Sequence, residues 1–392
     1  MSKAVIFGAG NIGRGLVGRI FFEAGYKVTF IDVNEKLVKL LHSSKGYPIY
    51  VTMGNEYELR NIKNVDAVDG NDIDAVCAAA KDASIIATAV GVNALKYIIP
   101  SIAAIIKQRY ISNPDGFLNF ILCENMIDVH IYVRGLLKEH LNNEEWDFCE
   151  NHIGFCQSSI GCMVPVPSKE LIEKNPLAVA VEDYNKIYTD KDGVRGELPE
   201  IENIIPYSPF SYYIHLKLYM HNMSHSICAY LGFQKGYTYI WEAILDMDIR
   251  NKVERALEET ASALSLYYKV EIQELNEYGA DLVKRYGNRL LADTVARVGA
   301  DPKRKLGVHD RLIGAAKFCL DNRIMPTTII ETIPLVFRFD VKTDPSSQEV
   351  NAFYKENGLS EALKKYCMIN ETEPIFAKIL AADKKYRESE NE

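Results

Sequence analysis

The sequence predicts an α/β fold, with a doubly wound parallel sheet at the N-terminal end and a mainly helical C-terminal domain after it. Three observations support this prediction. Up to about residue 125, short apolar runs alternate with helical periods, as in a parallel sheet that helices cover on both faces. A glycine-rich turn joins the first run to a helix. Beyond about residue 205, strand signals nearly vanish.

The predicted sheet is built from four continuous apolar runs. They are KAVIFGAG (3–10), KVTFIDV (27–33), ASIIATAV (83–90) and FLNFILCEN (117–125). The stretches GRGLVGRIFFEAGY and LVKLLHSS supply helical periods between runs. The alternation in YPIYVTMGNEYELRNI (47–62) indicates a small antiparallel insertion, and LAVAVEDYNKIY adds further short strands.

A domain boundary is predicted near residue 205. The segment 188–210 is the most turn-rich of the chain, with an Asp-Gly pair, two glycines and three prolines. Long helical periods follow it, at residues 253–268 and 291–298. We therefore expect a cofactor-binding sheet domain with extra strands at residues 1–205 and a helical substrate-binding and catalytic domain at residues 206–392.

Composition narrows the class of protein. A net charge of -8 argues against nucleic-acid binding, which normally requires a basic face. No apolar run approaches the roughly 18 residues that a membrane span requires. Because a predicted strand starts almost at residue 1, we expect no signal peptide. A cytoplasmic protein without a nucleic-acid or membrane partner is the simplest interpretation.

The eight cysteines are scattered and do not form a disulfide framework. One group, Cys149, His152, Cys156 and Cys162, raises the question of a metal site, but its spacing matches no C-x-x-C pattern. We expect free thiols in a reducing compartment and no bound metal.

The turn GAGNIG (8–13) follows the first predicted strand and opens a helix, so that Gly8, Gly10 and Gly13 have the spacing of a dinucleotide-binding turn. In that motif the first glycine permits the tight turn, the second permits close approach of a pyrophosphate, and the third permits helix–strand packing. The phosphates lie at the positive end of the helix. This context predicts a Rossmann-type domain. An ordinary strand–turn–helix without a ligand is the alternative.

Asp32 ends the second predicted strand, 19 residues after Gly13. An acidic side chain there accepts hydrogen bonds from the adenosine ribose and repels a 2′-phosphate, which favours NAD over NADP. FAD uses the same fingerprint and remains an alternative. Arg14 either contacts the phosphates or is solvated. The expected cofactor-binding residues are Gly8, Ala9, Gly10, Asn11, Ile12, Gly13, Arg14 and Asp32.

The stretch KLYMHNMSHS (217–226) places polar side chains in an otherwise apolar helical segment. At about 100° per residue, Lys217, His221, His225 and Asn222 fall within one sector of a helix. A solvated face or a satisfied core network is the alternative to a site. As a site, the stretch suits metal-independent alcohol oxidation. A desolvated lysine can act as the base, an asparagine can hold the oxyanion, and a histidine can orient the hydroxyl.

The pattern K-x4-N-x2-H, together with FGAGNIGRG (7–15), CENM (123–126) and RVGADPKRKLGVHDRLI (297–313), resembles the polyol-specific long-chain dehydrogenases over nearly the whole chain. Within that family it is most similar to the mannitol-1-phosphate 5-dehydrogenase branch. The resemblance implies that Lys217 is the general base and that Asn222 and Asn125 hold the reacting oxygen. His225 orients the substrate. Arg297 and Lys305 grip its far hydroxyls or charged end, unless they belong to a surface basic cluster with Lys303 and Arg304. His221 has no counterpart.

The chain departs from the family at two places. Where relatives carry Val-Asp-Arg-Ile before a proline, this chain has Ile160-Gly161-Cys162-Met163, and Gly314 and Ala315 stand where lysine and proline usually follow Asp-Arg-Leu-Ile. The resemblance implies NAD-dependent, metal-independent interconversion of D-mannitol 1-phosphate and D-fructose 6-phosphate, by a monomer or weak homodimer. The departures leave open a hexuronate (fructuronate or tagaturonate) or unphosphorylated polyol reductase. A non-catalytic NAD-binding relative is the third possibility.

Overall fold

The computed structural model describes residues 2–54, 56–165 and 167–390, and the chain divides into two compact units. The first unit comprises Met1–Ile214 and the second His215–Glu392. The predicted boundary near residue 205 stays a prediction; the compact units divide nine residues later, after the last strand of the first unit's sheet, β11 (Ile204–Tyr207). This strand lies within the turn-rich segment, where the sequence did not predict a strand.

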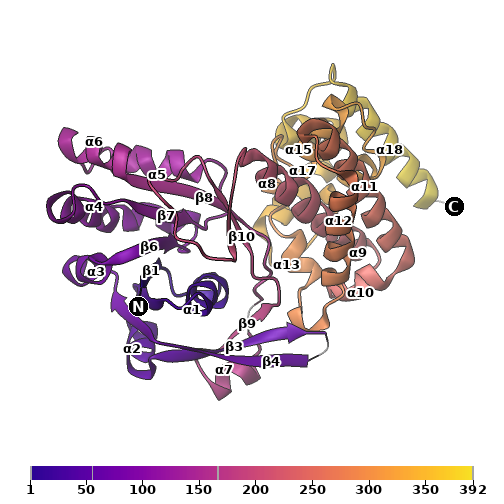
Figure 1. The fold of residues 1–392 in the computed structure, drawn as a ribbon. Helices are drawn as coiled ribbons and strands as arrows, with labels where there is room; N and C mark the ends of the chain where they lie inside the picture. Colours follow the sequence, from indigo (N-terminus) through magenta and orange to yellow (C-terminus); the bar gives the residue numbers. More distant parts are fainter. Residues whose placement is uncertain (1, 55, 166, 391–392) are drawn as a thin grey trace. The chain divides into compact units, whose positions relative to one another are not determined.

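The first unit is built on an eight-stranded sheet with the order β11-β10-β8-β7-β6-β1-β2-β5 (Figure 1). Its other strands are β10 (Ile187–Asp190), β8 (Ile153–Ile160), β7 (Leu118–Leu122), β6 (Ala83–Thr88), β1 (Lys3–Phe7), β2 (Lys27–Asp32) and β5 (Val65–Asp69). Neighbouring strands are parallel except for β10, which runs antiparallel to β8. All four predicted strands are present. The doubly wound parallel sheet is therefore confirmed, with an added antiparallel edge.

Both faces of the sheet are covered, as the apolar character of its strands requires. The side chains of β1 alternate, with Ala4 and Ile6 in one hydrophobic core and Val5 and Phe7 in the other. The first core receives η1 (Gly13–Gly18), α1 (Arg19–Glu23) and α2 (Glu35–Ser44), and the second receives α3 (Ile73–Ala80), α4 (Leu95–Ser112), α5 (Val129–Leu137) and α6 (Asn143–His152). Figure 1 shows the two sets on opposite sides of the strands.

The insertion between β2 and β5 forms a second, three-stranded sheet. Its hairpin consists of β3 (Gly46–Met53) and β4 (Glu56–Lys63), and β9 (Val179–Glu182) pairs in parallel with β3. The antiparallel insertion is thus confirmed, and it recruits a third strand from far along the chain. The glycine-rich helix packs against this sheet, since a Cβ at Gly15 would lie 2.6 Å from Val181.

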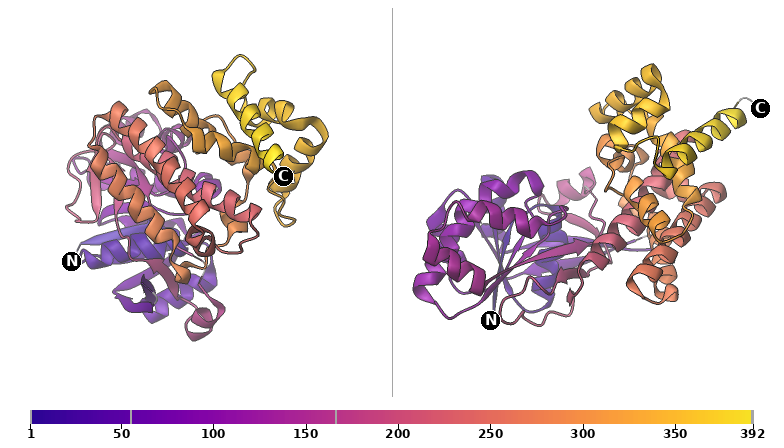
Figure 2. Two further views of the ribbon diagram at one scale, coloured as in Figure 1. Left: turned by 90° about the vertical axis from the view of Figure 1, so that its right-hand side faces the viewer. Right: turned by 90° about the horizontal axis from the view of Figure 1, so that it is seen from above.

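The second unit is a helical bundle around α9 (Met223–Gln234), which is buried along most of its length and packs against four other helices. Those neighbours are α10 (Ile240–Leu245), α11 (Met247–Tyr268), α13 (Val295–Gly299) and α16 (Thr327–Phe337). Around them lie η3 (Leu216–Asn222), α12 (Ile272–Tyr286), α14 (Pro302–Lys305), α15 (Ile313–Asp321), α17 (Pro345–Ala362), η5 (Leu363–Cys367) and α18 (Pro374–Glu390). Figure 2 shows these helices, coloured from pink to yellow, packed side by side. The mainly helical C-terminal domain is confirmed.

None of the helices described here is long and apolar enough to cross a membrane. The eight cysteines are all free thiols. His152, the histidine of the suspected metal group, stacks on Phe148 with ring centroids 4.8 Å apart. Within the described residues, no three side chains of histidine, cysteine, aspartate or glutamate gather in a way that could hold a metal ion.

Candidate active site

The glycine turn after β1 has the backbone geometry that its sequence predicts. Gly8 has a φ of +96°, and a Cβ there would lie 2.5 Å from the carbonyl oxygen of Ala89. Its N–H donates to the carbonyl of Ile31 at 2.8 Å, which ties the turn to β2. A Cβ at Gly13 would lie only 2.0 Å from the carbonyl oxygen of Gly8. Only glycine permits the helix to approach the strand this closely.

Gly10 and Asp32 meet the two further requirements for a dinucleotide. A Cβ at Gly10 would meet nothing within 4 Å, so this part of the turn faces open space. The Asp32 carboxylate, at the end of β2, accepts from the N–H of Ala9 at 2.7 Å and from the N–H of Asn34 at 2.9 Å. Since a carboxylate has about four acceptor positions, Asp32 retains capacity for ribose hydroxyls. These residues fit NAD.

Arg14 is a structural link within the first unit. Its side chain is buried, with Nε donating to the carbonyl of Ala9 at 2.7 Å and Nη1 donating to the carbonyl of Leu177. Its own carbonyl accepts from the Tyr47 hydroxyl at 2.8 Å. Of the two alternatives raised for Arg14, the solvated one is wrong. Contact with a phosphate stays a prediction.

Asn125 lies in the loop after β7, at the edge of the sheet where the parallel strands β1, β6 and β7 all end. The preceding residue, Glu124, is buried and connects this loop to the one after β6. Its carboxylate accepts from the Thr88 hydroxyl at 2.6 Å and from the N–H of Val90 at 3.0 Å. Burial raises the pKa of Glu124 despite these hydrogen bonds. Ligands of open α/β sheets bind at this edge, so Glu124 supports the loop that presents Asn125.

Lys217 and Asn222 lie on η3, which is a π-helix rather than the α-helix that the 100° spacing assumed. In a π-helix, each N–H bonds to the carbonyl five residues earlier. Lys217 and Asn222 are five residues apart, so they stand one turn apart on the same side. The α-helical spacing of 100° per residue was therefore wrong for this pair, because it would place the two side chains about 140° apart. The π-helical stretch brings the expected base and amide together.

His225 begins the next turn, on α9, and its imidazole faces a buried carboxylate. Its Nε2 lies 3.3 Å from Oδ2 of Asp293. Asp293 is 7% exposed, and its Oδ1 accepts from Nε of Arg297 at 2.7 Å. Burial lowers the pKa of His225 more than Asp293 raises it, which favours a neutral ring. Burial alone would raise the pKa of Asp293, but His225 and Arg297 leave it lowered.

The aromatic ring of Tyr286 fixes the other side of His225. The two rings stack with centroids 4.7 Å apart and an angle of 6° between their planes. The Tyr286 hydroxyl lies 2.8 Å from Oγ of Ser224 and donates to the carbonyl of His221 at 2.9 Å. His221 is itself buried, and burial holds its pKa well below the usual value. His221 is thus part of the core around His225.

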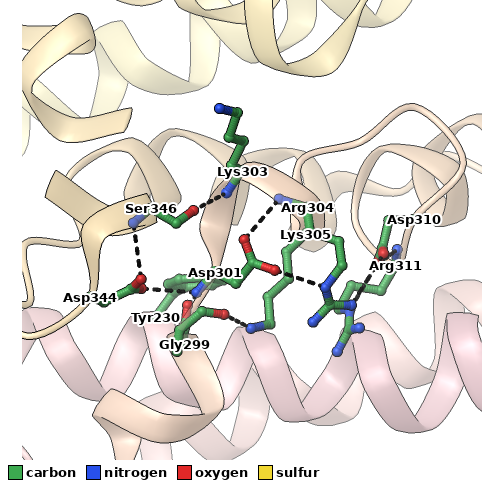
Figure 3. A network of polar contacts seen from close by, with 11 residues as sticks. Tyr230, Gly299, Asp301, Lys303, Arg304, Lys305, Asp310, Arg311, Asp344 and Ser346 are labelled. Carbon is green, nitrogen blue, oxygen red and sulfur yellow. Dashed lines mark hydrogen bonds and ion pairs between the residues drawn. The ribbon is translucent and has the colours of Figure 1, made fainter. Parts of the chain in front are cut away.

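Arg297 and Lys305 have different environments. The Arg297 side chain is 60% exposed and pairs with Asp293, whereas Lys305 is 4% exposed and donates to the carbonyl of Ala300. Lys303 and Arg304 are surface residues. Lys303 pairs with Glu349, and Arg304 pairs with Asp301 (Figure 3). The surface-cluster alternative therefore holds for Lys303 and Arg304 but is wrong for Lys305.

At both departures from the family pattern, other atoms of the chain occupy the space beside the glycine. A Cβ at Gly161 would meet the ring of Tyr184 at 3.4 Å, so this tyrosine covers the position. A Cβ at Gly314 would lie 3.0 Å from the backbone of His309 and 3.2 Å from the Tyr219 hydroxyl. A side chain at 314 therefore requires its surroundings to move.

Sequence reasoning missed Asp293 and Glu124. A signal for Glu124 was available, because it stands within the quoted CENM motif. Asp293 is four residues before Arg297, a spacing at which opposite charges pair on a helix. Its approach to His225 required the tertiary structure.

The chain matches two family models along most of its length. Residues 2–203 match the mannitol dehydrogenase Rossmann domain, and residues 210–389 match the mannitol dehydrogenase C-terminal domain. A mannitol-1-phosphate 5-dehydrogenase of Thermoanaerobacter pseudethanolicus is 35% identical over 388 residues, covering 99% of this chain and 98% of that one. The enzyme of the same name from Bacillus subtilis is 36% identical over 379 residues, covering 96% and 98%.

Two solved structures share the fold at low sequence identity. A D-sorbitol dehydrogenase in substrate-free form has a TM-score of 0.80 at 15% identity, covering 99% of this chain and 94% of that one. Pseudomonas fluorescens mannitol 2-dehydrogenase, in a ternary complex with NAD and D-mannitol, has a TM-score of 0.71 at 16% identity, covering 99% and 91%.

Proposed function

The chain belongs to the mannitol dehydrogenase family, and on that premise we propose that it is an NAD-dependent, metal-independent polyol dehydrogenase. Its substrates in the two directions are D-mannitol 1-phosphate and D-fructose 6-phosphate. The observation that carries the proposal is the full-length similarity to mannitol-1-phosphate 5-dehydrogenases, at 35% and 36% identity. Similarity confined to the cofactor domain would support only a nucleotide-binding role.

The second unit supplies the proton chemistry. Bound NAD accepts a hydride when a secondary alcohol is oxidised, and NADH returns it when the ketone is reduced. Lys217 accepts the hydroxyl proton in oxidation and gives it back in reduction. Asn222, on the same side of the π-helix, donates an amide N–H to the oxygen on which negative charge develops. Such a donor stabilises the transition state without carrying a charge of its own.

His225 orients the substrate hydroxyl, and its surroundings suit that role. A neutral imidazole donates one hydrogen bond and accepts another. Asp293 on one side and the ring of Tyr286 on the other restrict its rotation. The resemblance also implies that Asn125, in the first unit, is a second donor to the reacting oxygen. This role stays a prediction.

The decisive experiment is a screen of NADH oxidation with fructose 6-phosphate, fructose, fructuronate and tagaturonate. We expect kcat/KM for fructose 6-phosphate to exceed that for fructose by about a hundredfold or more, because removing one partner of a buried, hydrogen-bonded charge pair costs about 2–5 kcal/mol. Equal rates with and without the phosphate would overturn the choice of substrate. Absence of turnover on every ketose and keto acid, despite tight NADH binding, would overturn the enzymatic role.

A hexuronate reductase is the second candidate. The observation that favours it is the ring of Tyr184 over Gly161, in a segment where relatives carry an Asp-Arg pair. A changed side chain at this position fits a substrate that has a different terminal group. In the same screen, this candidate predicts that fructuronate or tagaturonate is preferred over fructose 6-phosphate.

A further inference from the structure

Two cationic side chains are buried in the segment 301–312, which contains α14 and its link to α15, and the proposed chemistry does not require both. Lys305 is 4% exposed and Arg311 is 9% exposed. Burying a charge is costly unless a partner of opposite charge or a ligand compensates for it. The carboxylates in the segment are those of Asp301 and Asp310, and Asp301 pairs with the surface residue Arg304 at 3.0 Å.

Arg311 has unused hydrogen-bonding capacity. Its main-chain N–H and its Nε both donate to Oδ1 of Asp310, at 2.6 and 2.7 Å. Within the part of the chain that the structure describes, its two terminal nitrogens make no hydrogen bond. A guanidinium presents these nitrogens as a planar fork that matches two oxygens of a phosphate or carboxylate. A side chain about nine-tenths buried therefore offers an open anion-binding fork.

Lys305 faces the same region. In Figure 3 the side chains of Lys305, Arg304 and Arg311 extend from the segment in the same direction. Burial lowers the pKa of Lys305 to about 7, with further lowering by the positive charges of Arg311 and Arg304 that Asp301 and Asp310 only partly offset. The ammonium group uses one of its three donors on the carbonyl of Ala300. A bound anion would relieve the repulsion between these cations.

This pair of cations adjoins the residues proposed for catalysis. Gly314, three residues after Arg311, packs against the Tyr219 hydroxyl of η3, the helix that carries Lys217. The positive charge of Arg311 also lowers the pKa of His225, although burial is the larger cause. The charge of Arg311 therefore acts on both Lys305 and His225.

We propose that Arg311 joins Lys305, which the family resemblance already implies for the far end of the substrate, in a subsite that binds the phosphate monoester. This inference rests on the proposed function and deepens it, by assigning the group that distinguishes a phosphorylated ketose from a free one. A phosphate monoester is close to a dianion near pH 7, so it matches two cations. Arg311 contributes the fork and Lys305 contributes a second positive charge.

The test compares Arg311→Gln with Arg304→Gln, a matched control from the same segment. Arg304 is 49% exposed in its side chain and pairs with Asp301. We expect Arg311→Gln to raise the KM for fructose 6-phosphate about 10- to 100-fold, with kcat within a few-fold of wild type and the KM for fructose unchanged. The KM of Arg304→Gln for fructose 6-phosphate should stay within threefold of the wild-type value. Arg311→Lys keeps the charge and loses the fork, so its KM for fructose 6-phosphate should lie between those of wild type and Arg311→Gln.

A second measurement does not depend on turnover. Inorganic phosphate, titrated by calorimetry into the full-length protein, should bind to wild type and to Arg304→Gln but not to Arg311→Gln. Thermal unfolding and NADH titration would show that each variant is folded. If wild type turns over fructose 6-phosphate and Arg311→Gln leaves its KM unchanged, the subsite is wrong and the proposed function survives. If wild type turns over only free ketoses or keto acids, the proposed function fails. The calorimetric titration with inorganic phosphate then tests by itself whether Arg311 and Lys305 bind a phosphate.

Discussion

The two units prepare their ligand-binding groups in different ways. The first unit relies on backbone: Gly8 and Gly13 permit a close turn, and Gly10 leaves open space beside it. The second unit relies on charged and polar side chains placed among buried helices, such as Asp293 between His225 and Arg297. A backbone site depends on a short stretch of sequence. A side-chain site depends on distant residues and on the free energy of burying charge.

This difference predicts distinct responses to mutation. Changes in the first unit should affect cofactor affinity or folding and leave proton transfer intact. Changes in the second unit should affect catalysis and substrate affinity and leave cofactor binding intact. Each prediction below tests that separation, in order of decreasing expected effect.

Replacing Lys217 should have the largest effect. Because general acid–base catalysis contributes about 10²- to 10⁴-fold, Lys217→Ala should lower kcat by at least a hundredfold at every pH tested. The dissociation constant for NADH, measured by fluorescence titration, should change less than twofold. Lys252→Ala, an exposed lysine on α11, serves as the control. A Lys217→Ala variant with normal turnover would contradict the assignment of the base.

Gly13→Ala and Gly10→Ala should separate folding from cofactor binding in the first unit. A Cβ at position 13 would clash with the carbonyl of Gly8 at 2.0 Å, whereas a Cβ at position 10 would meet nothing within 4 Å. We expect Gly13→Ala to lower Tm by several degrees. Gly10→Ala should keep the wild-type Tm and weaken NADH binding by about tenfold or more, because the methyl group occupies space that the pyrophosphate requires. Equal NADH affinity in Gly10→Ala and wild type would argue against that placement.

Asp293→Asn should weaken catalysis through His225. The substitution preserves shape and removes the charge that pairs with both His225 and Arg297. We expect kcat/KM to fall about tenfold, as for loss of one charge-assisted hydrogen bond, with a shifted pH profile. The matched control is Asp383→Asn, an equally buried aspartate between Arg338 and Arg387. Both variants should lose stability. If the control also loses kcat/KM with the same pH shift, Asp293 has only a structural role.

The smallest effect concerns pH. Lys305 has a pKa of about 7, so it loses its positive charge as the pH rises through 7. Its charged neighbours are Arg311, Arg304, Asp301 and Asp310. Affinity for a phosphate should therefore decrease above pH 7. Between pH 7 and pH 8 the KM for fructose 6-phosphate should rise up to about fivefold.

The comparison substrate and a variant isolate this pH effect. The KM for fructose should not follow the same trend, and Lys305→Arg should flatten the profile for the phosphorylated substrate, because an arginine stays charged throughout this range. A parallel rise in KM for both substrates would assign the titration to another group.

Much of the fold could be predicted because its signals are local. The four apolar runs became β1, β2, β6 and β7, and the alternating segment became the hairpin β3–β4. The strands β5 (VDAVD) and β11 (IIPY) were missed, since one has two aspartates among its five residues and the other contains a proline. The pairing of β9 with β3 joins segments far apart in sequence, which no local pattern reports.

For the candidate site, sequence reasoning identified the residue types but not their surroundings. The spacing of Lys217, Asn222 and His225 is local, and so is the resemblance that it carries. The partnership of His225 with Asp293 and the burial of Lys305 arise only when helices pack. An α-helical wheel also misplaced Asn222, because the 100° spacing does not hold in a π-helix.

The π-helical stretch Leu216–Asn222 has a genetic consequence. A π-helical turn is equivalent to an α-helical turn that has gained one residue, so removing a single codon here would leave a continuous α-helix. After that deletion Lys217 and Asn222 would be four residues apart in an α-helix, about 40° apart around its axis, and so still on one face. Helical content and the alignment of the lysine with the amide and the imidazole would both barely change. A one-codon insertion is thus absorbed as a π-helical turn, with the residues on either side of it kept in line.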